Sequence, residues 1–378
     1  MKNTMIRRLL AGILGTAALA AGAAEPVIDL SAKTEKLVAF QEPGKFCGWP
    51  ANEGIWSWGD EILVGFELRD YLKSSKTHSA DYSKPGRCVL ARSLDGGRSW
   101  KLETPEAFNR PEYIGDASRN DRQERPPRKL AEPLDFRAPG FAMKLRGTMF
   151  YTSADRGRNW DGPFRLEIAG VDRLLMSRTD YIVEGPHSCM IFTSALKSDG
   201  KSGRSLAART DDGGLSWKLV AWLTGEPELG VKNSFSIMPS TVKLPDGTFV
   251  TALRERRNKK KWIDIRRSED GGRTWDKAAT PSEMAWNPPS LIRLADGRLC
   301  LTYCDRRKPY SLRARLSGDG GRSWGPVLIL RQDAASWDMG YVRSVQRPDG
   351  KVVTLCYYTT AELEPQHIAA TIWNPEEL

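Results

Sequence analysis

Two residues with acid–base chemistry, His78 and Asp81, stand three positions apart in the polar stretch RDYLKSSKTHSADYSKPGRC (69–88). An imidazole titrates near neutral pH, so it can give or take a proton, and a carboxylate can do the same or act as its partner. The spacing favours an acid–base pair in which either residue carries the proton. Two ordinary surface residues of a polar loop explain the pattern equally well.

Tyr341 is a further candidate, because it opens an alternating β-rich run in the segment DMGYVRS (338–344). Gly340 before it and the hairpin after it favour a position at the mouth of a pocket, and a core or rim tyrosine is the alternative. Arg343 follows two residues later and would point to the same side of an extended strand. Glu67, which ends the apolar run LVGFE, is a possible partner of Tyr341.

Arginines at the ends of other strand-like runs favour binding of an anion. A guanidinium group can hold a carboxylate through two parallel hydrogen bonds, which suits recognition of an acidic sugar. The alternative for Arg254, Arg256 and Arg307 is a solvated charge, whereas Arg137 and Arg178 could equally cap a strand. The candidates are Arg254 and Arg256 in TALRERR, Arg307 in YCDRRK, Arg137 in LDFRAP and Arg178 in SRTDY.

An eight-residue phrase, repeated five times, indicates the elements that must position these side chains. The copies are SLDGGRSW (93–100), SADRGRNW (153–160), TDDGGLSW (210–217), SEDGGRTW (268–275) and SGDGGRSW (317–324). They recur at intervals of roughly 50–60 residues, which is typical of repeat architectures. In such a phrase the Asp can accept backbone N–H bonds in a tight turn, Gly allows positive φ, and Trp can pack on a neighbouring repeat. We therefore assign the phrase to the fold and not to the chemistry.

Hairpin signals lie between the repeated phrases. STVKLPDGTFVTALR, SLIRLADGRLCLTYC and SVQRPDGKVVTLCYY each contain two β-rich runs joined at an Asp-Gly pair, which is a strong hairpin signal. Each unit thus consists of a strand, a turn, a strand, a loop, a strand, the phrase and a final strand. Four antiparallel strands per unit are typical of a propeller blade.

We predict an all-β chain that forms a six-bladed β-propeller as one domain over residues 25–378. The N-terminal run EKLVAF (35–40) is expected to complete the last blade. We also expect strand geometry to separate the repeated turns from both the Asp-Gly hairpins and the blade-to-blade loops, which would form the site.

The first 24 residues are predicted to be a secretory signal, removed on export to the periplasm or the cell exterior. Lys2, Arg7 and Arg8 precede the apolar run 9–20, and small residues follow it, as in signal peptides. No later run is apolar enough to span a membrane. The formal charge of +10 favours acidic partners such as anionic glycans. Nucleic acid is a poor fit for an exported chain, and we expect a monomer.

The six cysteines allow disulfides in an exported protein. Cys300, Cys304 and Cys356, however, sit in apolar strand-like runs, where cysteine is often a small core residue. The chain has three histidines and no Cys-x-x-Cys or His-x-x-x-His spacing. No motif therefore requires a metal ion or another cofactor.

The five phrases resemble the Asp-boxes of the sialidase (neuraminidase) superfamily, and the resemblance covers nearly the whole mature chain. It implies hydrolysis of terminal sialic acids by three arginines on the substrate carboxylate, a Tyr nucleophile assisted by Glu, and an Asp acid/base. Carried over, Tyr341 matches the nucleophile and Arg254 or Arg256 the second arginine. Arg306, Arg307 and Arg313 offer the third arginine, and Asp81, Asp70 or His78 the acid/base.

The chain departs from the sialidase pattern at three places. It reads Gly48-Trp49-Pro50 where the first arginine is expected, Ser240 where the helper Glu is expected, and Tyr357 or Tyr358 in place of a late Glu. Either the substrate differs from sialic acid or another arginine, such as Arg137, substitutes. The leading interpretation is an exported sialidase-like glycosidase that acts on the ends of acidic glycans.

Two alternatives remain open. The first is another glycan-cleaving reaction on the same scaffold, such as β-elimination from a uronate, with Tyr341 and His78 as base and acid. The second is a non-catalytic propeller that binds a glycan or a protein.

Overall fold

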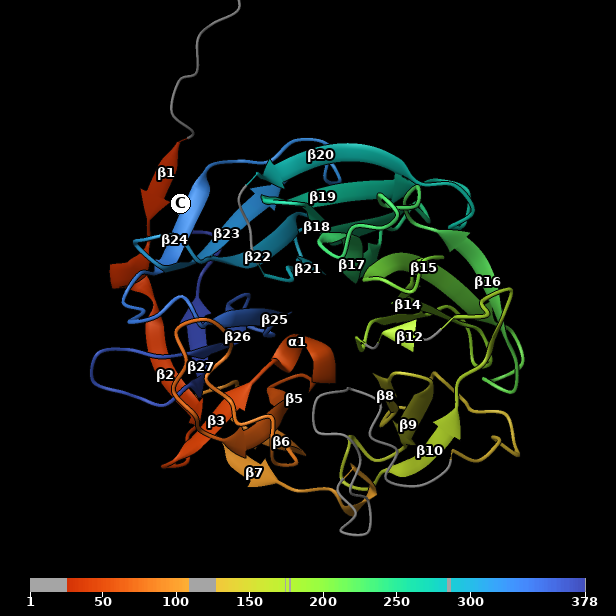
Figure 1. Ribbon diagram of the computed structural model, residues 1–378, viewed down its shortest axis with the longest axis horizontal. Coiled ribbons are helices and arrows are strands. Elements are labelled where there is room, and N and C mark those ends of the chain that lie inside the picture. The colour runs from red at the N-terminus through yellow and green to blue at the C-terminus, as the bar shows by residue number, and fades with distance from the viewer. Residues whose placement is uncertain (1–25, 109–126, 174, 177, 284–286, 378) are drawn as a thin grey trace, which may run out of the picture.

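A computed structural model describes residues 26–108, 127–173, 175–176, 178–283 and 287–377. Within these ranges the regular structure is almost entirely β, which confirms the predicted all-β class, and the sheets are arranged around a common centre (Figure 1). The predicted signal peptide lies outside the described residues. The short helices are η1 (Ser31–Lys33), α1 (Pro50–Glu53) and η2 (Glu106–Phe108).

The first sheets in chain order are antiparallel. The first has the order β3-β5-β6-β7, with β4 also paired to β5, and the second has the order β10-β9-β8. Their bounds are β3 (Lys45–Gly48), β4 (Ile55–Trp58), β5 (Glu61–Asp70), β6 (Arg87–Ser93), β7 (Lys101–Glu103), β8 (Ala142–Arg146), β9 (Met149–Ser153) and β10 (Asp161–Arg165).

A ten-stranded sheet follows, in which two runs of strands are joined by a single parallel pairing of Arg204 with Ser236. The first run comprises β11 (Ile168–Ala169), β12 (Leu175–Met176), β13 (Tyr181–Val183), β14 (Cys189–Leu196), β15 (Gly203–Thr210) and β16 (Trp217–Trp222). The second run comprises β17 (Ser234–Lys243), β18 (Phe249–Arg257), β19 (Lys260–Ser268) and β20 (Asp276–Ser282).

The last two sheets each take an outer strand from the N-terminal part of the chain. Strand β1 (Val27–Asp29) pairs in parallel with β24, and β2 (Glu35–Phe40) pairs antiparallel with β27. The EKLVAF segment thus completes the last sheet as predicted. The other strands are β21 (Ser290–Arg293), β22 (Leu299–Asp305), β23 (Ser311–Ser317), β24 (Val327–Arg331), β25 (Gly340–Gln346), β26 (Val352–Tyr358) and β27 (His367–Trp373).

The Asp-Gly pairs form the predicted hairpin turns between β17 and β18, β21 and β22, and β25 and β26. Gly247, Gly297 and Gly350 have φ between 85° and 92°, a conformation that costs glycine little. In the first of these turns, the Asp246 carboxylate accepts a bond from the Thr248 amide at 2.9 Å. Local turn chemistry therefore fixes the register of these strands.

The five repeated turns share the hydrogen bonds of their Asp and Ser or Thr side chains, and four of them also share the bond of the final Trp, which Trp217 lacks. In the first copy, Asp95 Oδ1 accepts the backbone N–H groups of Arg98 (3.0 Å) and Ser99 (2.9 Å). Ser93 Oγ accepts the amide of Gly97 at 2.7 Å, and Trp100 donates its indole N–H to the carbonyl of Gly97. These contacts confirm the structural role predicted for the phrase.

Each repeated turn also contacts the sheet that precedes it. A side chain at Gly321 would meet Ile265 and Val250 of the second run at 3.2 Å, and one at Gly97 would meet Val353 of the last sheet at 3.0 Å. Trp160 packs against Trp56 of the first sheet with ring centroids 5.3 Å apart. The turns therefore hold neighbouring sheets together.

The expected separation of the Asp-Gly hairpins from the repeated turns is wrong. Arg347, beside the last Asp-Gly turn, donates to the carbonyl of Gly96 in the first repeated turn at 3.0 Å. The reason is strand parity: in a four-strand meander, the first-to-second and third-to-fourth turns lie at the same end. We call this end the box end and the opposite one the site end.

All six cysteines are buried and none forms a disulfide. Cys300, Cys304 and Cys356 lie together in one apolar cluster between the last two sheets, in keeping with their interpretation as core residues. Over the described ranges, no helix is long and apolar enough to cross a membrane.

Candidate functional site

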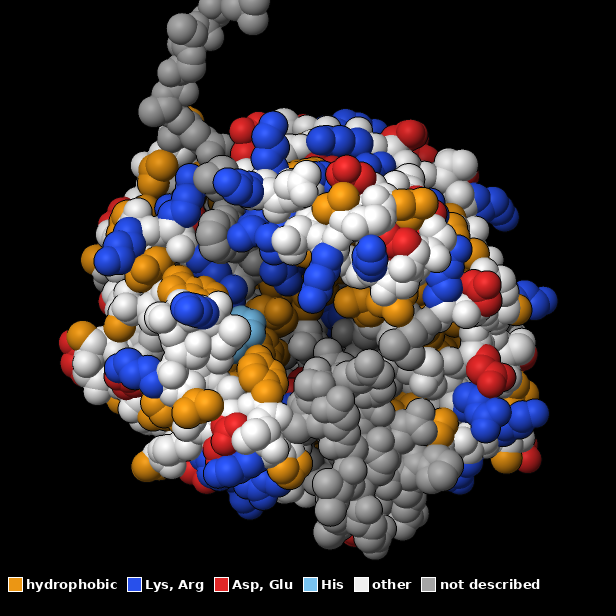
Figure 2. Space-filling model, viewed as in Figure 1, with side chains coloured by type: hydrophobic (Ala, Val, Ile, Leu, Met, Phe, Trp, Pro, Cys, Tyr) orange, Lys and Arg blue, Asp and Glu red, His pale blue; other side chains and the backbone are white. Residues whose placement is uncertain are grey.

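Side chains from four parts of the chain meet at the site end. The loop after β5 supplies His78, the segment that leads into β25 and the start of that strand supply Asp338 and Tyr341, and the ends of β22 and β26 supply Arg306 and Tyr357. β5, β22 and β26 end at the site end and β25 begins there, because their hairpin turns lie at the box end. Lys and Arg side chains border the hollow at the centre of the molecule (Figure 2).

His78 and Asp338 form the centre of the site. Nδ1 of His78 lies 2.5 Å from Oδ1 of Asp338. The other carboxylate oxygen accepts the amide of Ser79 at 2.8 Å and the side-chain amide of Gln366 at 3.1 Å. Asp338 is fully buried, whereas 22% of the His78 side chain is exposed. A carboxylate on Nδ1 favours the tautomer that leaves Nε2 available to accept a proton.

The pKa values of both residues are shifted. Burial lowers the pKa of His78; the bond to Asp338 opposes this effect, and the charges of Arg306 and Arg254 reinforce it. Burial alone would raise the pKa of Asp338, but the bond and charge of His78 together with the Ser79 amide bring it below its usual value. At neutral pH the pair therefore consists of an aspartate beside a neutral imidazole.

Tyr357 connects this pair to a buried arginine. Its hydroxyl donates to Oδ1 of Asp338 at 2.9 Å and lies 3.2 Å from Nδ1 of His78. Arg306 donates to the same hydroxyl and, through Nε, to the carbonyl of Met339 at 2.9 Å. Burial raises the pKa of Tyr357 well above its usual value, so Tyr357 is a neutral phenol in this network.

Tyr341 stands beside His78, with ring centroids 6.1 Å apart in an edge-on contact. Its φ of 55° is left-handed, and the register of β25 shifts between Gly340 and Arg343. Such bulges re-aim side chains and recur beside active sites. Burial lowers the pKa of Arg254, and the neighbouring Tyr341 phenol opposes this effect. Tyr341 thus lies between His78 and a cation.

Aromatic rings flank the imidazole. Trp49, with a left-handed φ of 57°, lies 5.4 Å from His78 and stacks on Tyr82 at 6.1 Å. Trp337 lies 6.2 Å from His78, and the Arg306 guanidinium covers its ring at 5.2 Å. Exposed and half-buried rings beside polar groups provide surfaces on which a sugar ring can stack.

The expected pairing of His78 with Asp81 is wrong. Asp81 accepts the amide of Ser83 at 2.9 Å and its hydroxyl at 2.5 Å, and closes a local turn. A carboxylate two residues before a serine readily forms such a turn, which draws it away from the imidazole. The partner of His78 is Asp338, which lies 260 positions along the chain.

The prediction for Arg307 is wrong by one residue. Arg307 bonds to Asp305 through Nε at 3.0 Å and leaves 46% of its side chain exposed, while Arg306 faces the site. Neighbouring residues leave a strand in opposite directions. Arg254 lies beside Tyr341 and Arg306, whereas Arg256 bonds to the carbonyl of Asn258 in the adjoining turn at 2.8 Å.

Arg343 and Arg178 are buried and bind the backbone. Arg343 donates to the carbonyls of Ala51 (2.8 Å) and Thr179, and Arg178 donates to those of Met238 (3.0 Å) and Pro289 (2.7 Å). Both therefore join segments of different sheets. The expectation that Arg343 shares a face with Tyr341 is wrong, because the bulge at Tyr341 interrupts the alternation of the strand.

Arg137 and Glu67 do not reach the site as predicted. Arg137 donates to the carbonyl of Glu184 at 2.8 Å, and nearby Leu134 bonds to Gly213 of a repeated turn, so Arg137 lies at the box end. Glu67 is on the site side of β5 but forms an ion pair with Arg69 at 2.5 Å. Arg69 in turn covers the ring of Tyr82, so Glu67 supports the aromatic wall.

Sequence reasoning missed Asp338, Tyr357 and Trp49 as members of the site. A carboxylate three residues before Tyr341 in DMGY was the available signal for Asp338. Tyr357 and Trp49 occupy positions where the sialidase pattern has other residues, and nothing local distinguishes them from core aromatics.

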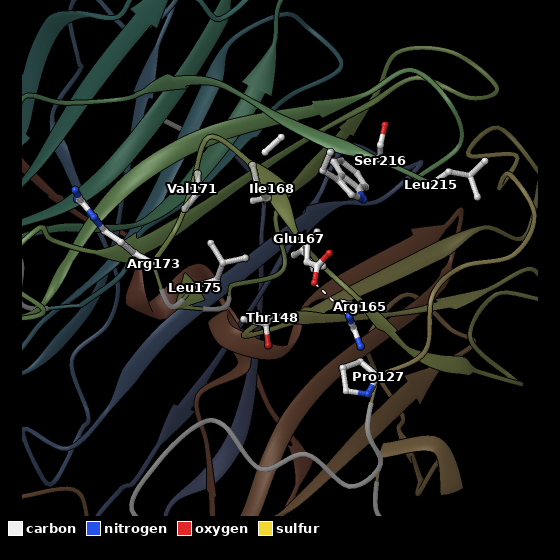
Figure 3. Close-up of a pocket in the computed structure, with 13 residues that line it drawn as sticks. Pro127, Thr148, Arg165, Glu167, Ile168, Val171, Arg173, Leu175, Leu215 and Ser216 are labelled. Atoms are coloured by element: carbon white, nitrogen blue, oxygen red, sulfur yellow. Dashed lines mark hydrogen bonds and ion pairs between the residues drawn. The ribbon is translucent and has the colours of Figure 1, made fainter.

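A separate cavity of about 770 Å³ lies away from these residues (Figure 3). It borders β10, β11 and β16, and its lining includes Trp217, Leu175 and an Arg165–Glu167 pair at 3.4 Å. It contains none of the site residues described above. Its lining combines apolar side chains with one weak surface ion pair, which offers no chemistry of its own.

Comparison with known proteins supports the fold. The BNR repeat-like domain family matches residues 138–354. A protein of unknown function from Dyadobacter fermentans DSM 18053 superposes with a TM-score of 0.67 at 20% identity, covering 89% of this chain and 97% of that one. No curated protein sequence matches significantly.

Two glycosidase structures superpose at lower similarity. The NanB sialidase from Streptococcus pneumoniae gives a TM-score of 0.58 at 12% identity, covering 90% of this chain and 71% of that one. The α-L-arabinanase of Penicillium chrysogenum, complexed with arabinobiose, gives 0.55 at 11% identity, covering 91% and 98%. At these identities the likeness concerns the fold alone.

Proposed function

This chain belongs to the BNR repeat-like domain family, and from that premise we propose that it is an exported, sialidase-like glycosidase that removes terminal residues from acidic glycans. In this proposal residues 1–24 are the signal peptide and residues 25–378 form one six-bladed propeller, the ten-stranded sheet counting as two blades. The protein acts as a monomer.

One observation carries the proposal: a histidine–aspartate pair and two cationic side chains face the same space. His78 is oriented by Asp338 at 2.5 Å, and the charges of Arg254 and Arg306 both act on His78. Proton transfer and anion binding are the two requirements for cleaving the bond of an acidic sugar. A binding protein needs only the second.

The proposed reaction assigns one task to each group. Arg254 and Arg306 hold the carboxylate of the terminal sugar, and the rings of Tyr82 and Trp337 contact its neighbour. His78 gives a proton to the leaving oxygen as the glycosidic bond breaks, and Tyr341 stabilises the positive charge that develops at the anomeric carbon. Water then attacks that carbon and returns a proton to His78, so one water molecule is consumed per bond.

The test is an assay of purified residues 25–378 on a fluorogenic α-sialoside and on a panel of uronate-containing oligosaccharides. We expect release of the terminal acidic sugar, and a loss of about 100-fold or more in kcat for Tyr341→Phe. Tyr71→Phe is the matched control, because the Tyr71 hydroxyl bonds to Glu364 at the surface. Tight glycan binding without cleavage of any substrate would contradict the proposal and favour a binding propeller.

One observation favours β-elimination from a uronate as a second candidate. Burial lowers the pKa of His78, and a neutral imidazole is a base. His78 would take the C5 proton, the C4–O bond would break as a C4–C5 double bond forms, and Tyr341 would protonate the leaving oxygen. These roles are the reverse of those expected from the sequence, because burial disfavours the charged imidazole. The unsaturated product absorbs ultraviolet light and takes up no oxygen from labelled water, whereas the product of hydrolysis does take it up.

A further inference from the structure

A continuous chain of hydrogen bonds joins the anion-binding side of the site to its proton-transfer side. Arg306 donates to the hydroxyl of Tyr357, which donates to Asp338 at 2.9 Å. Asp338 in turn meets Nδ1 of His78 at 2.5 Å. A change in charge at Arg306 therefore reaches the imidazole both through space and through this chain.

Few charged groups face His78, so their balance is easily altered. The groups around it are Phe46 of β3, Trp49 just after β3, Trp337, Asp338 and Tyr341 before and at the start of β25, Tyr357 of β26, and Arg254 and Arg306 near the ends of β18 and β22. In this set Asp338 is the one carboxylate, and it stands against two guanidinium groups.

A third cation adjoins these arginines and increases the local excess of positive charge. Lys261 lies across from Arg256 on β19. Burial together with Arg256, Arg254 and Arg306 lowers its pKa to about 8. Because several positive charges lie close together on this side of the site, an anion should bind more tightly here than at an isolated arginine.

We propose that the anionic group of the substrate, by lying against Arg254 and Arg306, switches His78 from a neutral imidazole in the empty site to a protonated one in the loaded site. The inference rests on the proposed function and explains how His78 can act as an acid. The proton comes from solvent and reaches Nε2, while the proton on Nδ1 stays directed at Asp338. Binding a neutral sugar leaves the imidazole unprotonated, so the substrate charge itself selects acidic glycans.

The direction of the effect follows from the charges present. Besides burial, Arg306 and Arg254 lower the pKa of His78, and Asp338 raises it. A carboxylate that neutralises the guanidinium groups removes the lowering contribution and leaves the raising one. We therefore expect the pKa of His78 to rise when the anion binds.

The measurement is an NMR pH titration of the mature chain with labelled histidine. The chain has three histidines, His78, His187 and His367, so the spectrum contains few signals. The signal missing from His78→Gln identifies His78, and the other two report on the fold. The titration is run without ligand, with N-acetylneuraminic acid, with glucuronic acid, and with glucose as the neutral control.

Three variants test the inference without any ligand. Arg254→Gln and Arg306→Gln each remove one charge. Arg254 is not a member of the hydrogen-bond chain through Tyr357, so its variant tests the effect of charge alone. Arg307→Gln removes a neighbouring charge that is bonded to Asp305. We expect the pKa of His78 to rise in the first two variants and to stay unchanged in the third.

An unchanged pKa of His78 in both Arg254→Gln and Arg306→Gln would overturn the inference. So would a rise in these variants with no rise on saturation by either acidic sugar, because the anion would then lie elsewhere. An equal rise in Arg307→Gln would contradict the assigned geometry. Failure of the proposed function shows differently: the variants shift the titration of His78 while no glycan is cleaved.

Discussion

The two ends of the ring differ in how their chemistry is encoded. At the box end, five copies of one phrase build the same turn, and the residues that bond to each other lie within a few positions in the chain. At the site end, His78 bonds to a residue 260 positions away, and Arg306 to one 51 positions away. Local bonds recur wherever the phrase recurs, while the site exists once.

The difference shows how a repeat architecture divides its tasks. Turns at the box end pack each sheet against its neighbour, so they contribute to the stability of the ring of sheets. Strands then deliver single side chains to the opposite end, where no repeat constrains the loops. The arginines make the same distinction: Arg178 and Arg343 join segments of different sheets through backbone carbonyls, whereas the charges of Arg254 and Arg306 act on His78.

The sharpest test of this division removes the carboxylate that orients His78. Asp338→Asn should lower kcat/KM by about 1000-fold, because the imidazole loses its partner and its preferred tautomer. The stability to urea should change far less than the activity. The matched control is Asp81→Asn, since Asp81 bonds only within its own loop; activity assays and urea unfolding of both variants provide the comparison.

A smaller effect is expected for the arginines. Arg306→Gln should raise KM for an acidic substrate by about 10- to 100-fold, because a charge-assisted bond to its carboxylate is lost. Arg307→Gln, one residue along, should leave KM within about twofold, since that side chain binds Asp305. Equal effects in the two variants would mean that Arg306 does not bind the anion.

Most of the fold could be predicted because its signals are local. The Asp-Gly turns, the alternating runs and the repeated phrase each act within about ten residues, and the positions of β17, β22 and β25 follow from them. Strand parity could also have been worked out from the sequence, and it corrects the expected separation of the hairpins from the boxes.

The site could be predicted only in part, because its contacts are long-range. His78, Tyr341 and Arg254 were found by residue type and position, but the choice between Arg306 and Arg307 depends on which face of β22 each leaves. The bulge at Tyr341 interrupts the alternation that placed Arg343 beside it. Asp81 shows the same limit, because it accepts hydrogen bonds from Ser83 in its own loop and does not pair with His78.

At the box end we expect a loss of stability without a loss of activity. Asp319→Ala removes bonds to the amides of Arg322 (3.0 Å) and Ser323 (2.9 Å) and to two serine hydroxyls. The free energy of unfolding should fall by about 1–2 kcal/mol, as for the loss of a helix cap. Asp246→Ala, in a hairpin turn at the same end, should lower the free energy of unfolding by less, because it removes one hydrogen bond from a backbone amide. A fall in kcat at a temperature where both variants are folded would contradict the conclusion that the box end contributes to stability and not to activity.

The smallest expected effect is a pH dependence of the free energy of unfolding that arises at the same turns. Burial works against the shift, but bonds from Ser323 and Ser317 lower the pKa of Asp319 to about 2, against about 3.9 in an unfolded chain. A carboxyl group whose pKa is lower in the folded state stabilises above the unfolded pKa and loses that contribution as pH falls towards the folded one. The Asp319 carboxylate is exposed, so solvent screening limits its share to a few tenths of a kcal/mol. The difference in urea midpoint between the wild type and Asp319→Asn should therefore be largest above pH 4 and shrink towards pH 2. A difference that grows as the pH falls would have the wrong sign for a carboxylate stabilised by the turn.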